Sequence, residues 1–191
     1  MISLLNRRSD TPLDNTLETK AAYWEPRIKT YGFQRTTGLS LMEITVRSAG
    51  IESLGQACCR LGDAGVGFHL VFSRTSSRGL EVSLLVTAQW AKVIEERMQE
   101  FVEGTDEGMR RTSPAEMVFF QGPHFGDRYG IVDTALRALA AKGIKMTATA
   151  CSGSCIYIVL PEGKSEEAVL ALSEVFEIPK TSSHKRSMPT G

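Results

Sequence analysis

The hydrophobic residues of this 191-residue chain recur with two periods, and these periods predict its secondary structure. Alternate residues are apolar in five segments, as is typical of half-buried strands; they are residues 41–47, 66–72, 80–86, 144–148 and 156–160. A sixth strand is predicted at residues 116–121. Apolar residues recur every three or four positions in four other segments, which predicts amphipathic helices; they are residues 54–61, 90–101, 131–140 and 165–176.

The same order of elements occurs twice. Gly65 and Gly143, which each follow a predicted helix, lie 78 residues apart, and Val82 and Ile156 in the following hairpins lie 74 residues apart. Each copy is therefore a strand, a helix, two strands and a helix, with a shorter hairpin in the second copy. This order predicts antiparallel sheets with the helices on one face. The expected fold class is α+β, with two ferredoxin-like βαββα(β) modules.

The face of each sheet without helices is also predicted to be partly apolar. Val71, Leu85 and Phe120 fall on this face by alternation, so we expect a partner sheet or module to cover it. Each copy is close to the lower size limit for a self-sufficient core. The two copies are therefore expected to pack on each other or on a second chain.

The periodic segments also set the expected domain boundaries. The first module is predicted at residues 25–104, with an introducing strand at 27–33, and the second at residues 105–179. Residues 1–24 and 180–191 are polar and aperiodic, which predicts a flexible leader and a flexible tail.

Polar residues at the predicted helix ends suggest how the helices begin and stop. Ser53 begins a Ser-Leu-Gly-Gln sequence that is typical of a capping box, and Thr87 and Ser165 are the predicted caps of two further helices. Gly65 is suited to a left-handed residue after the first helix.

Charge and composition exclude several classes of function. The chain has 22 basic and 22 acidic residues without a block of like charge, which argues against nucleic acid as a partner. No apolar stretch is long enough for a signal peptide or a membrane span, so a cytoplasmic location without membrane binding is expected. The sequence contains no recognisable combination of a nucleophile with a general base, no pair of catalytic carboxylates and no cluster of residues with the spacing of metal ligands. We therefore expect neither catalysis nor a cofactor.

The four cysteines give a weak metal signal. Cys58 and Cys59 are adjacent in a helical pattern and point in different directions, whereas Cys151 and Cys155 flank a predicted tight turn. A zinc site needs more ligands, and His124 is the one candidate in a nearby loop. Small buried thiols are the favoured interpretation.

Three stretches of the chain resemble the last ACT module of aspartate kinases. They are Gly-Pro-His-Phe-Gly-Asp-Arg-Tyr-Gly-Ile at residues 122–131, Ala-Leu-Ala-Ala-Lys-Gly-Ile at 138–144, and the helix sequence at 165–176. Residues 41–101 resemble the preceding ACT module, and residues 27–33 the strand that introduces the pair. The resemblance covers residues 26–178 and includes none of the kinase domain. It therefore implies a free-standing regulatory half, and we expect no kinase activity.

In that family, paired modules dimerise side by side, and lysine or threonine binds at the interface for feedback inhibition. The site uses the loop between the first strand and the first helix, together with the start of the second strand of the facing module. Carried over to this chain, these positions give as expected ligand-binding residues Ser48, Ala49, Gly50, Ile51, Glu52, Gly67, Phe68, Ile144, Lys145 and Met146. The loops that lead into the helix N-termini add Ser53, His124, Phe125, Gly126, Asp127, Tyr129 and Gly130.

The chain departs from the family pattern at several of these positions. The first loop of the family has an Asp followed by Lys-Pro-Gly, and here the sequence is Ala49-Gly50-Ile51-Glu52. The Asp that pairs with a ligand's amino group is thus lost, and Lys145 adds a cation at a position where the family has Asn. Both loops lead into helix N-termini, where free N–H groups favour an anion. We therefore expect an acidic or neutral amino acid or carboxylate rather than lysine.

Alternatives remain at the level of function. The glycine-rich loop can serve as a tight turn without a ligand, and it lacks the Lys-Ser/Thr ending of a nucleotide-binding loop. The chain is interpreted as an amino-acid-binding regulatory module that acts through homodimerisation or a partner protein. A structural subunit without a ligand, and the regulatory chain of a split aspartate kinase, are the other two hypotheses.

Overall fold

The computed structural model describes residues 27–46, 50–102 and 109–179. The predicted leader and tail, residues 1–24 and 180–191, lie outside these residues. The first half of the described chain contains β1 (Ile28–Lys29), β2 (Phe33–Val46), α1 (Ile51–Asp63), β3 (Phe68–Ser76), β4 (Gly79–Thr87), the short 3₁₀ helix η2 (Ala88–Trp90) and α2 (Ala91–Val102). The second half contains β5 (Arg110–Gln121), α3 (Ile131–Ala141), β6 (Ala148–Ser152), β7 (Cys155–Pro161), α4 (Ser165–Val175) and β8 (Phe176–Glu177).

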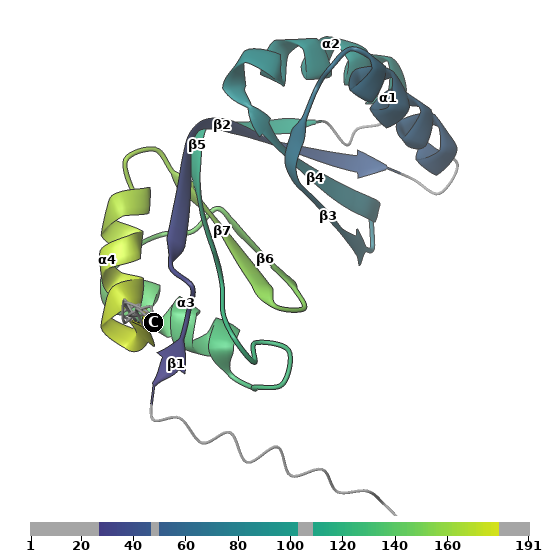
Figure 1. The fold of residues 1–191 in the computed structure, drawn as a ribbon. Coiled ribbons are helices and arrows are strands. Elements are labelled where there is room, and N and C mark those ends of the chain that lie inside the picture. Colours follow the sequence, from purple (N-terminus) through teal and green to yellow (C-terminus); the bar gives the residue numbers. More distant parts are fainter. Residues whose placement is uncertain (1–26, 47–49, 103–108, 180–191) are drawn as a thin grey trace, which may run out of the picture.

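Six strands form one antiparallel sheet in the order β3-β4-β2-β5-β7-β6 (Figure 1). Helices α1 and α2 cover the β3-β4 half of the sheet, and α3 and α4 cover the β7-β6 half. This is the predicted α+β class, with the helices of each copy on one face of its strands.

The two central strands are shared by both halves. In β2, residues 39–46 pair with β4, whereas residues 33–36 pair with residues 117–120 of β5. In β5, residues 115–121 pair with β7, and residues 110–112 return to pair with β2. Each module therefore has three strands of its own in the sheet, and half of a strand from the other module adds a fourth.

The shared strand explains where β2 begins. The prediction placed this strand at residues 41–47, but it starts at Phe33. Residues 33–38 are mostly polar and partly exposed because they form the outer strand of the second module. A register shift separates this part from the rest of β2, next to Gly38 with its φ of 68°.

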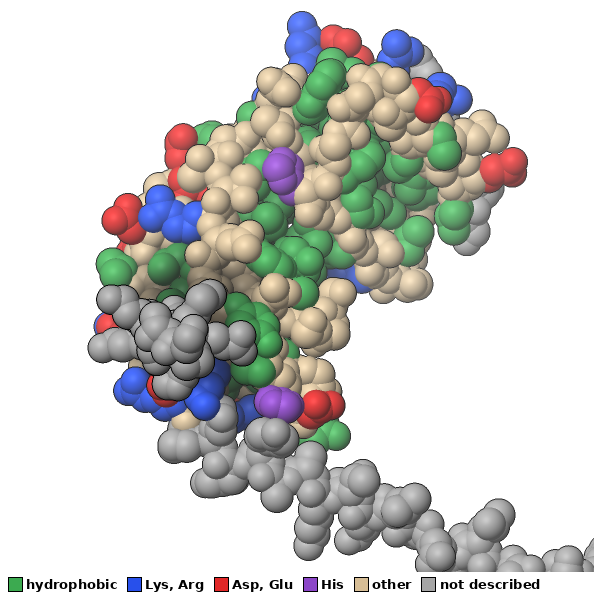
Figure 2. All heavy atoms as spheres, viewed as in Figure 1, with side chains coloured by type: hydrophobic (Ala, Val, Ile, Leu, Met, Phe, Trp, Pro, Cys, Tyr) green, Lys and Arg blue, Asp and Glu red, His purple; other side chains and the backbone are tan. Residues whose placement is uncertain are grey.

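Two cores lie under the helices, and a third lies between the modules. The first core joins α1 and α2 to their strands through residues such as Leu61, Met98 and Leu84, and the second surrounds Phe120. The third core lies on the helix-free face and contains Leu39, Leu41, Leu85, Ala115, Met117 and Val159, with Leu70, Phe72, Phe119, Ala148 and Tyr157 packed against them. The two helix-free faces thus cover each other. Figure 2 shows hydrophobic side chains gathered in the middle of the molecule, with many of the charged ones toward its periphery.

This arrangement corrects two predicted side-chain positions. Phe120 lies in the core under α3 and α4, not on the helix-free face. A register shift between Phe68 and Leu70 in β3 turns Leu70 and Phe72 toward the helix-free face and leaves Val71 exposed. Of the three residues that alternation assigned to that face, Leu85 is placed there by the structure.

The helix starts also differ from the predicted caps. Helix α1 begins at Ile51 after Gly50, so Ser53 lies inside the helix and forms no cap. Thr87 precedes η2, but its side chain makes no capping hydrogen bond. Gly65 has a φ of 81°, which confirms the predicted left-handed residue after the first helix, and Gly143, after α3, has a φ of 68°.

Ser165 is the first residue of α4, not its cap. Its backbone N–H donates a hydrogen bond of 2.8 Å to Glu116 Oε2 in β5, and the Glu116 side chain therefore caps the helix from a distant strand. Burial raises the pKa of Glu116, but hydrogen bonds from Ser165 and from the Gly163 backbone, with the charge of Arg35, outweigh it and hold that pKa below its ordinary value.

The segment at residues 28–31 forms hydrogen bonds both to the end of β5 and to β8, the last strand of the second module. Strand β1 pairs in parallel with β8, and the Thr30 N–H donates to the Glu177 carbonyl oxygen at 2.8 Å. The buried Thr30 hydroxyl and the Tyr31 N–H both donate to the Gln121 carbonyl oxygen, at 2.7 and 2.9 Å. These bonds fix the point at which the glycine-rich loop begins. No helix in the described part of the chain is long and apolar enough to cross a membrane.

Candidate functional site

The loop at residues 122–130 joins β5 to α3 along a tightly constrained path. A Cβ atom on Gly122 would stand 2.3 Å from a carbonyl oxygen of β1 and 2.4 Å from the Phe125 ring. His124 and Gly130 have left-handed backbones, with φ of 62° and 82°, and the Asp127 N–H donates to the His124 carbonyl oxygen at 3.1 Å. The loop therefore turns sharply and places Gly130 at the N-cap of α3.

Phe125 anchors this loop in the second core. Its side chain is buried, and its ring meets those of Phe120 and Phe176 at centroid distances of 5.9 and 6.4 Å. Phe125 was predicted as a ligand residue, and packing accounts for most of its surface. Tyr129, four residues further along the same loop, is in contrast 99% exposed, so its whole side chain is accessible at the surface of the loop.

A pocket of about 370 Å³ opens beside the loop, and we call it the α3 pocket. The end of the loop, the first turn of α3 and the β6-β7 hairpin enclose it. Its lining residues are Phe125, Arg128, Tyr129, Gly130, Ile131, Val132, Asp133, Cys151, Gly153 and Ile156. Most of this lining is apolar, and Arg128 and Asp133 are its charged members. The first turn of a helix also has backbone N–H groups with no partner inside the helix, which favour an anionic group.

A second pocket, of about 410 Å³, lies at the matching place in the first module, and we call it the α1 pocket. It is lined by Ile51, the first residue of α1, and by residues 75–80 of the β3-β4 hairpin. Residues 47–49, which lead into α1, lie outside the described part of the chain. Each module thus has a hollow between a helix N-terminus and a hairpin.

The structure brings some of the predicted ligand residues to these pockets and leaves others apart. Ile51 lines the α1 pocket, and Phe125, Tyr129 and Gly130 line the α3 pocket. Gly50, Glu52 and Ser53 lie at the start of α1, and His124, Gly126 and Asp127 lie in the glycine-rich loop, where His124 Nδ1 and Asp127 Oδ2 are 3.6 Å apart. Ser48 and Ala49 fall outside the described residues.

The predicted second-strand positions line neither pocket within the described chain. Ile144 is buried, and Met146 and Phe68 pack against the cores, whereas Gly67 and Lys145 are exposed. Their assignment to a pocket closed by a facing module stays a prediction.

The hairpin walls of both pockets were not predicted as site residues. Gly153 lines the α3 pocket and Gly79 lines the α1 pocket, and they lie 74 residues apart. This is the offset that relates Val82 to Ile156. The repeat offset, applied to the hairpin turns as well as to the strands, is the sequence signal from which these pocket walls could have been predicted.

The thiols are less buried than expected. Cys59 and Cys151 are exposed, and all four cysteines are free. Burial raises the pKa of the Cys58 thiol, and the adjacent Cys59 raises it further, so Cys58 is a poor nucleophile at neutral pH. No group of three or more His, Cys, Asp or Glu side chains within residues 27–46, 50–102 and 109–179 is placed to hold a metal ion.

Neither a family model nor a curated protein sequence matches this chain. The chain is, however, similar to solved structures. The regulatory subunit of aspartate kinase from Thermus flavus has a TM-score of 0.67 and 14% identity, with 77% of this chain and 98% of that chain covered. The aspartokinase alpha and beta subunit structure gives 0.64 and 15% identity, with 76% and 97% covered. Escherichia coli aspartokinase III in complex with lysine and aspartate gives 0.55 and 14% identity, with 81% and 35% covered.

These structures show which fold the chain has. It is the fold of the regulatory region of aspartate kinases, and the predicted tandem ACT-type arrangement is confirmed at this level. The chain spans nearly the full length of the regulatory subunit from T. flavus, whereas it covers about a third of aspartokinase III.

Proposed function

We propose that this chain is a non-catalytic regulatory module of the aspartate kinase ACT type, which binds a small amino acid or carboxylate and acts through a second chain. The observation that carries the proposal is the pair of pockets at matching positions in the repeat, each between a helix N-terminus and a hairpin. The shared fold with regulatory subunits of aspartate kinase supports it.

The lining of the α3 pocket indicates the class of ligand. Its volume of about 370 Å³ suits a small molecule. The first turn of α3 favours a carboxylate, and the apolar lining from Ile131, Val132 and Ile156 can pack against the carbon skeleton of the ligand. Aspartokinase III has been solved with lysine and aspartate, but this chain lacks the family's amine-pairing Asp. An acidic or neutral amino acid is therefore the proposed ligand.

A thermal-shift screen of the purified chain against the twenty amino acids tests this proposal. A ligand present at about 100 times its dissociation constant stabilises the native state by about 2.7 kcal/mol and raises the melting temperature. Calorimetry with aspartate, threonine and lysine then ranks the ligands. Tight binding of lysine, or a screen with no shift, contradicts the proposed ligand class.

Two pairs of variants locate the ligand. Tyr129→Ala removes a fully exposed wall of the α3 pocket, and Tyr31→Ala removes another exposed ring outside both pockets. Gly130→Val strains the left-handed cap of α3, and Gly163→Val places the same strain at a φ of 76° before α4. Weaker binding in the Tyr129 and Gly130 variants, with unchanged binding in their controls, is expected. Equal binding in all four places the ligand elsewhere.

We also propose that the chain acts as a homodimer or together with an enzyme partner. Strands β3 and β6 are the outer strands of the sheet, and an outer strand has unpaired backbone groups that another chain can pair with. Light scattering over a dilution series is expected to show a dimer in the micromolar range, and a monomer throughout contradicts it. The purified chain is expected to form no aspartyl phosphate from aspartate and ATP.

A structural subunit that binds no ligand is the second candidate. The departures from the family pattern at Ala49 and Lys145 favour it. The two candidates differ in one measurement. A dimer whose melting temperature is unchanged by all twenty amino acids supports the structural subunit.

A further inference from the structure

A third hollow lies between the two modules, and neither helix N-terminus lines it. We call it the intermodule groove, and its volume is about 460 Å³. One wall comes from the first module and from the start of β5, and the opposite wall is residues 147–149, at the start of β6. The groove is lined by Glu43, Ile44, Thr45, Phe72, Arg74, Arg78, Glu81, Ser83, Arg110, Thr147, Ala148 and Thr149.

Strand register places the charged side chains of this groove on one face. Arg74 of β3 pairs with Glu81 of β4, and Glu43 of β2 pairs with Arg110 of β5. Closer to the centre of the molecule the same helix-free face becomes the third hydrophobic core, which includes Leu41. The charged end of the face therefore remains open beside the second module, with Phe72 and Ala148 at the boundary between polar and apolar surface.

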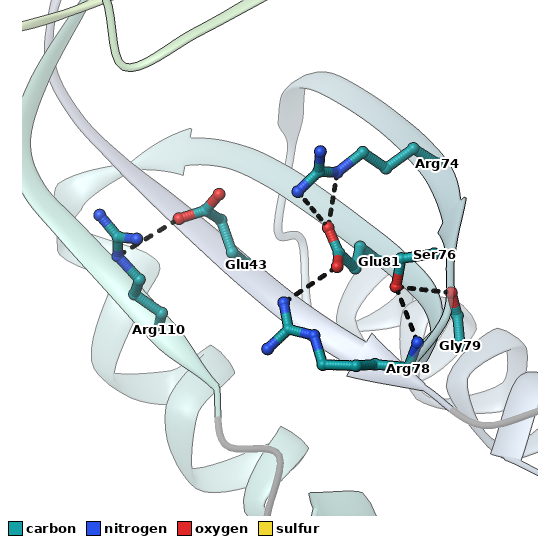
Figure 3. Close-up of polar contacts among 7 residues, drawn as sticks. All are labelled: Glu43, Arg74, Ser76, Arg78, Gly79, Glu81 and Arg110. Atoms are coloured by element: carbon teal, nitrogen blue, oxygen red, sulfur yellow. Dashed lines mark hydrogen bonds and ion pairs between the residues drawn. The ribbon is translucent and has the colours of Figure 1, made fainter.

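The arginines in the groove outnumber the carboxylates. Arg74 and Arg78 both point at the single carboxylate of Glu81, as Figure 3 shows; Arg74 pairs with Oε2, and Arg78 Nη2 lies 3.0 Å from Oε1. Arg110 Nε lies 3.6 Å from the Glu43 carboxylate. Three guanidinium groups thus face two carboxylates, and the surplus positive charge belongs to the Arg74-Glu81-Arg78 cluster.

Local hydrogen bonds hold this cluster in position. Ser76 Oγ accepts the Arg78 N–H at 3.2 Å and donates to the Gly79 carbonyl oxygen at 3.3 Å, which fixes the turn that carries Arg78. The Glu81 side chain is only 15% exposed, whereas those of Arg74 and Arg78 are 77% and 60% exposed. Hydrogen bonding from Ser76, followed by Arg78 and Arg74, lowers the pKa of Glu81 despite its desolvation, so this carboxylate stays ionised and orients both guanidinium groups.

From this geometry we propose that the intermodule groove binds a small organic anion through the guanidinium groups of Arg74 and Arg78. The anionic group is a carboxylate or a phosphate, because both accept paired N–H donors from arginine. The body of the ligand lies against Phe72 and Ala148, and the Thr147–Thr149 wall supplies polar groups from the other module. The ligand therefore contacts both modules at once. Its site shares Arg78 with the α1 pocket and shares no lining residue with the α3 pocket.

Titration with sodium phosphate and with sodium succinate, each against sodium chloride at equal ionic strength, tests this site. Calorimetry gives the affinity, and amide NMR shifts locate the ligand. Saturable binding is expected, with shifts at Ser83 and at Thr147–Thr149. Binding of succinate alone identifies a carboxylate ligand, and binding of phosphate alone identifies a phosphate ester. No saturation by either probe up to about 10 mM overturns the proposal.

Variants separate specific binding from general charge. The double variant Arg74→Gln/Arg78→Gln is expected to weaken binding at least about tenfold, because each guanidinium supplies charge-assisted hydrogen bonds. Arg110→Gln is a second, single change at the edge of the groove, and a loss of about threefold or more is expected. Arg97→Gln removes an exposed charge on α2, outside the groove, and is the matched control. Affinity that is equal in wild type and in both groove variants, or equally reduced in the control, overturns the assignment.

Discussion

A substitution at Gly122 tests whether close packing at this residue holds the glycine-rich loop in place. A Cβ atom at this position would stand 2.3 Å from the Lys29 carbonyl oxygen and 2.4 Å from the Phe125 ring. Both distances are far inside van der Waals contact, and neither neighbour moves easily. Lys29 is held in β1 by its pairing with β8, and Phe125 is buried in the second core.

Gly122→Ala is therefore expected to lower the free energy of unfolding by about 2–3 kcal/mol, within the range measured for overpacked cores. For a chain of this size, that corresponds to a fall of roughly 5–10 °C in melting temperature. The same loop offers a matched control. A Cβ atom on Gly126 would meet nothing within 4 Å, and its backbone is not left-handed.

Gly126→Ala is expected to change stability by less than about 1 kcal/mol, because it affects mainly the unfolded chain. Urea denaturation followed by circular dichroism gives both values. Equal stability of the two variants would show that β1 does not pack on Gly122, and the account of how the loop is anchored would be wrong.

Two further changes test the covered faces and the long-range cap. Leu85→Ala, in the core between the modules, is expected to cost about 2–5 kcal/mol, whereas Val71→Ala, at a side chain that is 53% exposed, is expected to cost less than about 0.5 kcal/mol; thermal unfolding compares them. Glu116→Gln is expected to cost about 1–2 kcal/mol at pH 7 in urea denaturation, because the ionised carboxylate caps α4. Since its folded pKa is lowered, this contribution is present above the ordinary value of 4.5 and is lost as the pH falls through the folded pKa, so the two proteins should converge in stability once the pH lies below that folded pKa.

The sequence predicted the elements that bury one face against a helix. Leu61 and Leu139 lie in helices whose apolar spacing is regular. Gly65 and Gly143 follow the ends of these helices as predicted, and Gly65 has the expected left-handed backbone. These features depend on residues close together in the chain, and periodicity reports such short-range order.

Features set by distant parts of the chain were missed. The register shift after Phe68 turns Leu70 to the other face, and alternation along a single strand gives no sign of it. Ser165 has the composition of a cap, but Glu116, 49 residues earlier, makes the capping bond. The first part of β2 is polar because it is the outer strand of the other module. This exchange cannot be seen when each copy of the repeat is considered separately.

The shared strands also bear on how the two modules communicate. Strands β2 and β5 each belong to both modules of the six-stranded sheet, and the intermodule core packs the helix-free faces of the two modules together. A change in the angle between the modules must therefore bend β2 and β5 near Gly38, where the register shifts, or disturb that core. The α1 and α3 pockets lie on the hairpins at the two ends of this single sheet, and the groove lies between them. A ligand that touches both walls of the groove binds one intermodule angle better than another, and by linkage it must then alter any pocket whose shape depends on that angle.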